Sequence, residues 1–196
     1  MTSLPRDRQR AGALALVPAE PAATADGTAG PVSFEQAYAL HAGYVAGLAG
    51  RILGRNDEVA DVVQEVFLVA HRHLAAVRHP AAVRTWLGRI TVREAGRRLR
   101  WRRLRHFFQP AGGEVDVIAE EAADVRLLVA LLYAALDRLA ARERTAWILR
   151  HLLDEPLDRV AELCGCSLAT VKRRIAAADA YLGPLLRPPT ESEGNR

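Results

Sequence analysis

The spacing of the apolar residues constrains this chain most, because it has the period of an α-helix and nowhere the alternation of a β-strand. In residues 57–74, DEVADVVQEVFLVAHRHL, the apolar side chains fall on one arc of a helix that turns by about 100° per residue. The same pattern runs through residues 34–53, 81–108 and 125–186. The sequence therefore predicts an all-α fold.

Breaks in this pattern divide the chain into two helical segments and three stretches without an apolar period. Residues 1–31 are rich in Ala, Pro, Gly and Thr, which predicts a disordered N-terminal extension. Residues 32–106 and 124–186 are each predicted to form a small helical domain. A flexible linker is expected over residues 107–123 and a disordered polar tail over 187–196.

The charge balance is modestly basic and rests on arginine. The 196 residues carry 27 Lys and Arg against 23 Asp and Glu, and Lys172 is the single lysine. Arginine suits phosphates and planar bases, although a GC-rich genome would produce the same bias. No apolar run reaches the about 18 residues of a membrane span. The basic start followed by residues 11–17 imitates a secretion signal, but it is short and ends at Pro18, so we expect a cytoplasmic protein.

The helix predicted over residues 57–74 carries an acidic face in this basic protein. Opposite its apolar arc lie acidic and polar side chains with a single leucine, Leu68, among them. The polar members are Asp57, Glu58, Asp61, Gln64 and Glu65. A solvated face would explain the carboxylates, but it would leave the exposed leucine without a role.

A cluster of arginines follows in residues 93–106, REAGRRLRWRRLRH, where Glu94 is the only acid. Such a density of like charge repels itself and favours a polyanionic partner. Trp86 and Trp101 flank the arginines, and aromatic rings among arginines suit unstacked bases as well as phosphates. A solvated basic face and binding to a membrane surface are the alternatives.

A helix-turn-helix is predicted in residues 157–175, LDRVAELCGCSLATVKRRI. The small residue Ala161 stands four positions before Gly165, where the turn needs a positive φ. Ser167 is a good N-cap for the second helix. On that helix Leu168, Val171 and Ile175 are expected to face inward. The outward side is then formed by Ala169, Lys172, Arg173 and Ala176, with Thr170 and Arg174 beside them. An ordinary helical hairpin is the alternative.

The sequence offers no cofactor site, metal site or catalytic group. Cys164 and Cys166 stand at positions that the helix-turn-helix expects to be apolar, and no second cysteine pair completes a set of four ligands. The histidines are scattered, and neither a nucleophile motif nor a Gly-rich phosphate loop is present. We therefore expect buried structural thiols and a protein that is not an enzyme.

Taken together, these segments resemble the extracytoplasmic-function (ECF) sigma factors, group 4 of the sigma-70 family of bacterial RNA polymerase. Residues 57–74 and 84–100, RTWLGRITVREAGRRLR, resemble parts of the family's region 2, and residues 136–182 resemble region 4. The resemblance implies an alternative sigma factor that binds core RNA polymerase, through its β′ clamp helices and β flap, and directs it to promoter DNA. It also implies that an anti-sigma factor can hold the chain inactive.

The resemblance assigns four groups of residues. Docking on the clamp helices would use Asp61, Gln64, Glu65 and Leu68. Recognition and melting of the −10 element would use Trp86, Arg93, Arg97, Arg98, Arg100, Trp101, Arg102 and Arg103. Recognition of the −35 element would use Ser167, Ala169, Thr170, Lys172, Arg173 and Arg174. Acidic linker residues would imitate nucleic acid near the RNA exit path: Glu114, Asp116, Glu120, Glu121 and Asp124.

The chain also departs from the family pattern. Arg93 and Arg97 stand where the family usually has Asn and Asp, and Ala140 replaces the usual Pro at the start of region 4. Other classes of function stay open on the sequence alone. They are a free-standing helix-turn-helix regulator that acts without polymerase docking, a sequestering interaction protein, and an RNA-binding protein.

Overall fold

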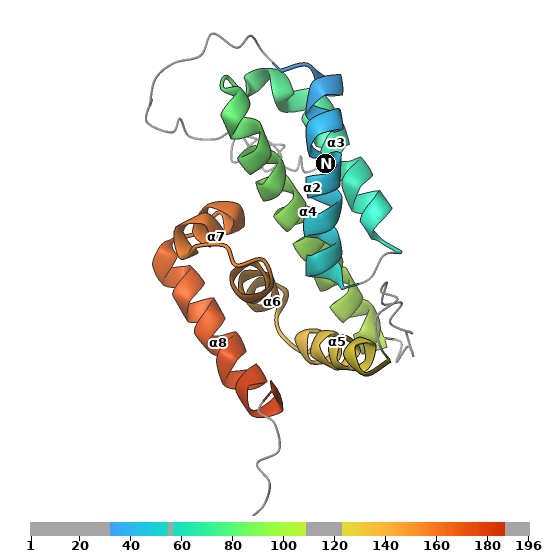
Figure 1. Cartoon of the computed structure of the whole chain (residues 1–196), viewed down its shortest axis with the longest axis vertical. Helices are drawn as coiled ribbons and strands as arrows, with labels where there is room; N and C mark the ends of the chain where they lie inside the picture. Colours follow the sequence, from blue (N-terminus) through green and yellow to red (C-terminus); the bar gives the residue numbers. More distant parts are fainter. Residues whose placement is uncertain (1–31, 55–56, 109–122, 187–196) are drawn as a thin grey trace, which may run out of the picture.

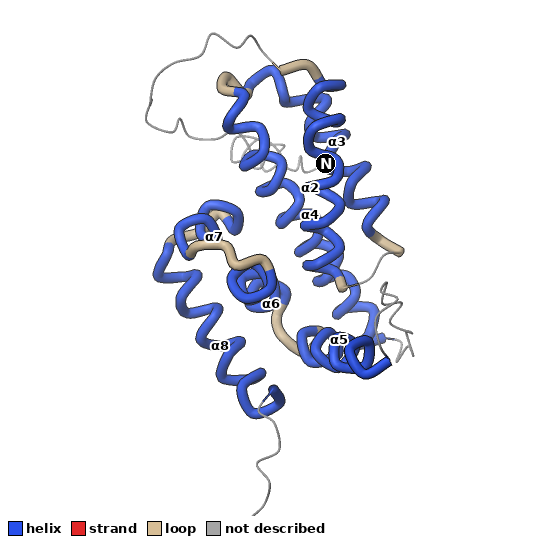
Figure 2. The backbone as a smooth tube through the Cα atoms, in the orientation of Figure 1, coloured by secondary structure: helices blue, strands red, loops and turns tan. Residues whose placement is uncertain are grey.

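A computed structural model describes residues 32–54, 57–108 and 123–186, and throughout them the regular secondary structure is helical (Figures 1 and 2). This confirms the predicted all-α fold. The predicted N-terminal extension, most of the linker and the tail lie outside the described residues. The first segment contains α2 (Phe34–Leu53), α3 (Val59–His73), the short 3-10 helix η2 (Leu74–Ala76) and α4 (Pro80–Phe108). The second contains α5 (Ala123–Leu136), α6 (Ala141–Trp147), the π-helical turn η3 (Ile148–Leu152), α7 (Leu157–Cys164) and α8 (Leu168–Leu186).

Both ends of α2 follow from local sequence signals. The Ser33 hydroxyl accepts a hydrogen bond from the backbone N–H of Gln36 at 3.2 Å, and the Gln36 side chain accepts one from the Ser33 N–H at 3.1 Å. This reciprocal pair satisfies two N–H groups that a helix start leaves unpaired. At the other end Gly54 adopts a φ of 67°, and its N–H donates to the Gly50 carbonyl at 2.7 Å.

The first segment packs α2 against α3 and α4 around one apolar core (Figure 1). Val45 and Ile52 from α2 and Val66 from α3 are fully buried, as are Leu87 and Ile90 from α4. Full burial of each side chain of this size contributes about 1.5–3 kcal/mol. The polar sides of α3 and α4 are thereby turned outward.

The second segment contains the predicted helix-turn-helix, formed by α7 and α8. Gly165 has a φ of 58°, as the tight turn requires. The Ser167 hydroxyl accepts a hydrogen bond from the Thr170 N–H at 3.3 Å, which confirms Ser167 as the N-cap of α8. Val171 is buried as predicted, but Leu168 is 36% exposed. Leu168 was predicted wrongly because it is the first residue of α8, and the buried side of that helix begins one turn later.

The two segments pack on each other, with α4 in contact with α6 and α7. The centre of this junction is Arg144, which is 2% exposed. Its Nε donates to the Ile52 carbonyl at 3.0 Å and its Nη2 to the Leu53 carbonyl at 2.8 Å, while its Nη1 pairs with Asp137. These carbonyls end α2, so Arg144 satisfies acceptors that the helix leaves unpaired. Burial lowers the pKa of Arg144, and the nearby Asp137 carboxylate opposes that shift.

Two further contacts place α7 directly on α4. Arg159 Nη1 donates to the Thr85 hydroxyl at 2.6 Å. Gly88 provides the close approach: a Cβ there would lie 2.7 Å from the Leu163 side chain and 2.6 Å from the Tyr44 hydroxyl. The helix-turn-helix is therefore held against the arginine-bearing helix. None of the described helices combines the length and apolar character needed to cross a membrane.

Candidate nucleic-acid and protein interfaces

The outer face of α3 presents the polar residues that the sequence singled out. Asp61, Gln64 and Glu65 are exposed, and Leu68 is 44% exposed among them. The opposite side of the helix is buried in the core through Val62, Val66, Phe67 and Ala70. The helix thus offers a carboxylate-rich surface with one apolar side chain at its centre.

An apolar groove of about 730 Å³ lies beside this face, between α2 and α3. Leu68 lines it together with Phe34, Tyr38, Val63 and Phe67. The Tyr38 ring is 48% exposed and stands 4.7 Å from the Phe67 ring, centroid to centroid. An apolar hollow with a polar rim is typical of a protein-docking surface. Tyr38 was not predicted to be part of this surface, because it falls on the apolar arc of α2, seven residues before the buried Val45.

The arginines of α4 have more acidic partners than the sequence indicated. Arg98 pairs with Asp61 at 3.1 Å, and Arg102 pairs with Glu58 at 3.0 Å while also donating to the Leu53 carbonyl. Within α4, Glu94 pairs with Arg97 at 2.7 Å and with Arg93 at 3.2 Å. The sequence predicted arginines with Glu94 as their only acidic neighbour. This was wrong because Asp61 of α3 and Glu58, which precedes α3, lie against α4. Arg102, half-buried and bonded on both sides, joins α4 to the end of α2 and the start of α3.

The two tryptophans that flank the arginines, Trp86 and Trp101, have opposite environments. Trp86 is 1% exposed and belongs to the core, on the same side of α4 as Val83 and Ile90. The expectation that Trp86 contacts DNA does not hold for this structure, because its indole is closed off from solvent by neighbouring helices. Trp101 is 61% exposed, and Arg100 and Arg103 next to it are also exposed. The side of α4 open to a nucleic acid is therefore centred on Trp101.

The outer face of α8 exposes Ser167, Ala169, Lys172 and Arg173, with Thr170 half-buried. The Ser167 and Thr170 hydroxyls lie 2.9 Å apart. Arg174 lies apart from this face, because its Nη1 donates to the Cys166 thiol at 3.3 Å. Small residues beside two cations leave room for the edge of a base pair, so this face has the composition of a recognition helix.

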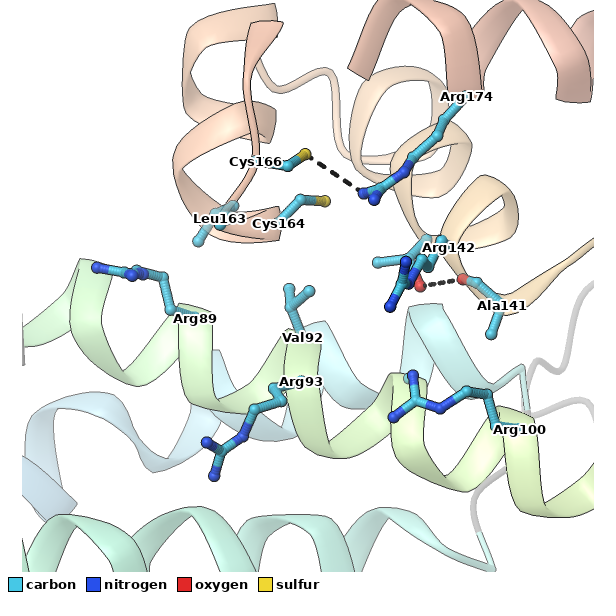
Figure 3. Close-up of a pocket in the computed structure, with 13 residues that line it drawn as sticks. Arg89, Val92, Arg93, Arg100, Ala141, Arg142, Leu163, Cys164, Cys166 and Arg174 are labelled. Carbon is cyan, nitrogen blue, oxygen red and sulfur yellow. Dashed lines mark hydrogen bonds between the residues drawn. The ribbon is translucent and has the colours of Figure 1, made fainter. Parts of the chain in front are cut away.

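A cleft of about 480 Å³ separates α4 from the helix-turn-helix (Figure 3). Its lining includes five arginines and no acidic residue: Arg89, Arg93, Arg100, Arg142 and Arg174. Cys164 and Cys166 line it as free, half-buried thiols. Burial raises the pKa of Cys164 to about 12, so its thiol stays protonated at neutral pH. Among the described residues no group of three or more His, Cys, Asp or Glu side chains is placed to hold a metal ion.

Both segments match known families. Residues 37–105 match the family model for sigma-70 region 2, and residues 130–178 match that for sigma-70, region 4. The ECF RNA polymerase sigma factor SigM of Mycobacterium tuberculosis is 34% identical over 155 residues, covering 79% of this chain and 77% of the relative. The RNA polymerase sigma-H factor of Pseudomonas aeruginosa is 31% identical over 159 residues, covering 73% and 82%.

Two solved structures share the arrangement of helices. The sigma factor RpoE of Bartonella quintana, in complex with the anti-sigma factor NepR, matches with a TM-score of 0.58 at 23% identity, covering 80% of this chain and 98% of that one. CnrH, in complex with the cytosolic domain of CnrY, matches with a TM-score of 0.53 at 28% identity, covering 78% and 86%.

Proposed function

The chain belongs to the extracytoplasmic-function (ECF) sigma factors, and from this membership we propose how its surfaces serve transcription initiation. It is an alternative sigma factor that directs RNA polymerase to promoters. The match to both sigma regions, in order and along one chain, carries this conclusion. The chain makes no covalent bond itself in this proposal and works in the cytoplasm beside the polymerase.

Core polymerase binds the outer face of α3 in this proposal. Leu68 enters an apolar site on the β′ clamp helices, and Asp61, Gln64 and Glu65 form the polar rim around it. Their exposure supports this role, as does the groove next to Leu68. Buried apolar anchors inside a polar rim supply most of the affinity at such interfaces.

Promoter DNA is bound by two surfaces in this proposal. Near the −10 element, Arg100, Trp101 and Arg103 contact unpaired bases and phosphates, with Arg93, Arg97 and Arg98 exchanging their carboxylate partners for phosphates. At the −35 element, Lys172 and Arg173 on α8 contact the major groove, and Ser167, Ala169 and Thr170 lie beside them. Arg174 takes no part in this contact, because it is bonded to Cys166 away from the outer face. Arg102 acts by holding α4 in place, since its guanidinium is already bonded on both sides.

An anti-sigma factor controls the chain in this proposal. Two structures of similar fold hold such a partner or a partner's cytosolic domain: RpoE with NepR and CnrH with CnrY. The exposed groove between α2 and α3 offers an inhibitor a surface that overlaps the polymerase-docking face.

Transcription from sigma-free core polymerase tests the proposed function. The purified chain is added to core and a fragmented genomic library, beside a Leu68→Glu, Glu65→Arg variant and a matched Leu128→Glu control. Leu128 is 65% exposed on α5, so the control carries a similar exposed change outside the docking face. We expect discrete transcripts with the wild type and the control, and none with the docking variant. DNA binding by the chain alone, without transcripts when core is present, would instead indicate a free-standing regulator.

A further inference from the structure

The cleft between α4 and the helix-turn-helix carries a concentration of positive charge that the proposed promoter contacts explain only in part, since Arg142 and Arg174 take no part in them. Arg100 from α4, Arg142 from α6 and Arg174 from α8 lie one after another along it (Figure 3). None of these three forms an ion pair with another residue in the described ranges. The walls are too close for a DNA duplex, because α7 rests on α4 at Gly88.

We propose that this cleft binds the polyphosphate group of a small ligand, with the three guanidinium groups as its anion site. Like charges brought together in a partly closed site repel one another, and a bridging anion removes that repulsion. Arginine presents planar, forked donors that match phosphate oxygens in pairs. A row of three such groups fits a chain of phosphates better than a single one.

The volume of the cleft and its other lining residues indicate which class of ligand fits it. The volume of about 480 Å³ lies within the range of small-molecule sites, roughly 300–1,000 Å³. Val92 and Leu163 also line the cleft, but they are only 8% and 2% exposed, so the arginines are its main contact groups. Cys164 adds no negative charge at neutral pH, since its thiol remains protonated. A nucleoside triphosphate and an inorganic polyphosphate share the chemistry that the arginines recognise.

Binding of such a ligand has a structural consequence. Arg100 belongs to the first segment, whereas Arg142 and Arg174 belong to the second, so a bridging polyphosphate stabilises the packing of the segments on each other. The ligand also occupies Arg100, which we assign to promoter contacts. Competition with promoter DNA therefore follows, and this one consequence rests on the proposed function.

Isothermal titration calorimetry of the full-length chain tests the site without polymerase or DNA, so its failure is distinct from failure of the transcription assay. The probes are inorganic tripolyphosphate, ATP and inorganic phosphate in 150 mM salt (roughly physiological ionic strength). We expect one tripolyphosphate per chain and at least tenfold weaker binding of phosphate. ATP binding more tightly than tripolyphosphate would identify a nucleotide as the ligand, and equal binding would identify an inorganic polyphosphate.

Two double variants distinguish a specific binding site in the cleft from general attraction of anions to arginine. Arg100→Ser with Arg142→Ser removes two side chains of the cleft, and tripolyphosphate binding should weaken at least tenfold. Arg103→Ser with Arg138→Ser removes the same charge from exposed positions outside the cleft lining and should change binding less than twofold. Circular dichroism confirms that both variants keep their helices. Absence of binding, several equivalents per chain, or an equal loss in both variants would overturn the proposal.

Discussion

Arg144 shows how a single side chain can join two helical segments. Its guanidinium is buried and donates to two carbonyls at the end of α2, while Asp137 balances its charge. Asp137 is 54% exposed, so solvent also stabilises that carboxylate. The contribution of Arg144 therefore comes mainly from the two carbonyls, of which the Leu53 carbonyl also accepts a hydrogen bond from Arg102.

Replacing Arg144 with alanine should lower the free energy of unfolding. Loss of the side chain removes the side-chain donor of the Ile52 carbonyl, while the Leu53 carbonyl keeps its hydrogen bond from Arg102. Since one unsatisfied group costs about 1–3 kcal/mol, we expect a loss of about 1–3 kcal/mol in urea denaturation. Arg142→Ala, an exposed change two residues away, should alter stability by less than about 0.5 kcal/mol. Equal stability of the two variants would contradict the role given to Arg144.

The Cys164 thiol should react slowly with alkylating agents in the folded chain. Its pKa of about 12, compared with 9.0 for an unperturbed thiol, lowers the thiolate fraction at pH 8 about a thousandfold. We expect iodoacetamide to modify Cys164 at that reduced rate in buffer and at an ordinary rate in 6 M guanidinium (roughly fully denaturing). Mass spectrometry of a time course separates Cys164 from Cys166. A rate unchanged by denaturation would show that burial does not control this thiol.

Local signals at single residues were predicted well, because they depend on neighbours in sequence. Ser167 caps the helix that its position indicated, and Gly165 has the positive φ expected of it. Trp86 was assigned to the wrong environment because its burial depends on helices distant in sequence. Arg98 was predicted to lack a carboxylate partner, and this was wrong for the same reason, since its partner lies on α3.

At the scale of helices, α3 and α8 each divide into a buried and an exposed side that sequence periodicity predicted. The π-helical turn η3 was not predicted, because Ile148–Leu152 keep an apolar pattern that an ordinary α-helix would also satisfy. The packing of α7 on α4 was missed as well. It depends on a hydrogen bond from Arg159 to Thr85 and on the absence of a side chain at Gly88, neither of which produces a periodic pattern.

Two substitutions on the outer face of α8 should affect promoter specificity and general DNA affinity separately. With core polymerase present, Arg173→Ala should weaken binding to the cognate promoter by about 1–3 kcal/mol and reduce discrimination at one base pair, since arginine reads guanine edges. Lys172→Ala should weaken binding to all sequences and reduce the slope of log affinity against log salt by about one. Fluorescence anisotropy with a −35 mutant series measures both effects.

Arg138→Ala serves as the control, since Arg138 is exposed and lies before α6. It should change neither the discrimination nor the salt slope. A loss of discrimination equal to that of Arg173→Ala would remove the assignment of α8 as the recognition helix.

At the scale of the whole molecule, the two sigma regions form one packed unit through α4, α6 and α7 (Figure 1). Gly88 lies against Leu163 of α7 and Tyr44 of α2, so Gly88→Leu should separate the segments and also displace the Tyr44 side chain within the first segment. We expect a larger radius of gyration in small-angle X-ray scattering and an unchanged far-ultraviolet circular dichroism spectrum. Gly43→Leu adds the same side chain where nothing lies within 4 Å of the added Cβ, and it should leave the radius unchanged. An equal radius for both variants would contradict the role of Gly88.

The assignment of α3 as the polymerase-docking face depends most on Leu68. Docking on polymerase is the property that distinguishes a sigma factor from other DNA-binding proteins. The direct measurement places a photo-reactive benzoylphenylalanine at position 68 of the full-length chain, with position 128 as the control. After irradiation with core polymerase, we predict a crosslink from position 68 to the β′ clamp helices and none from position 128. A crosslink from position 68 to another subunit, or none at all while the chain still supports transcription, would contradict the docking role of α3.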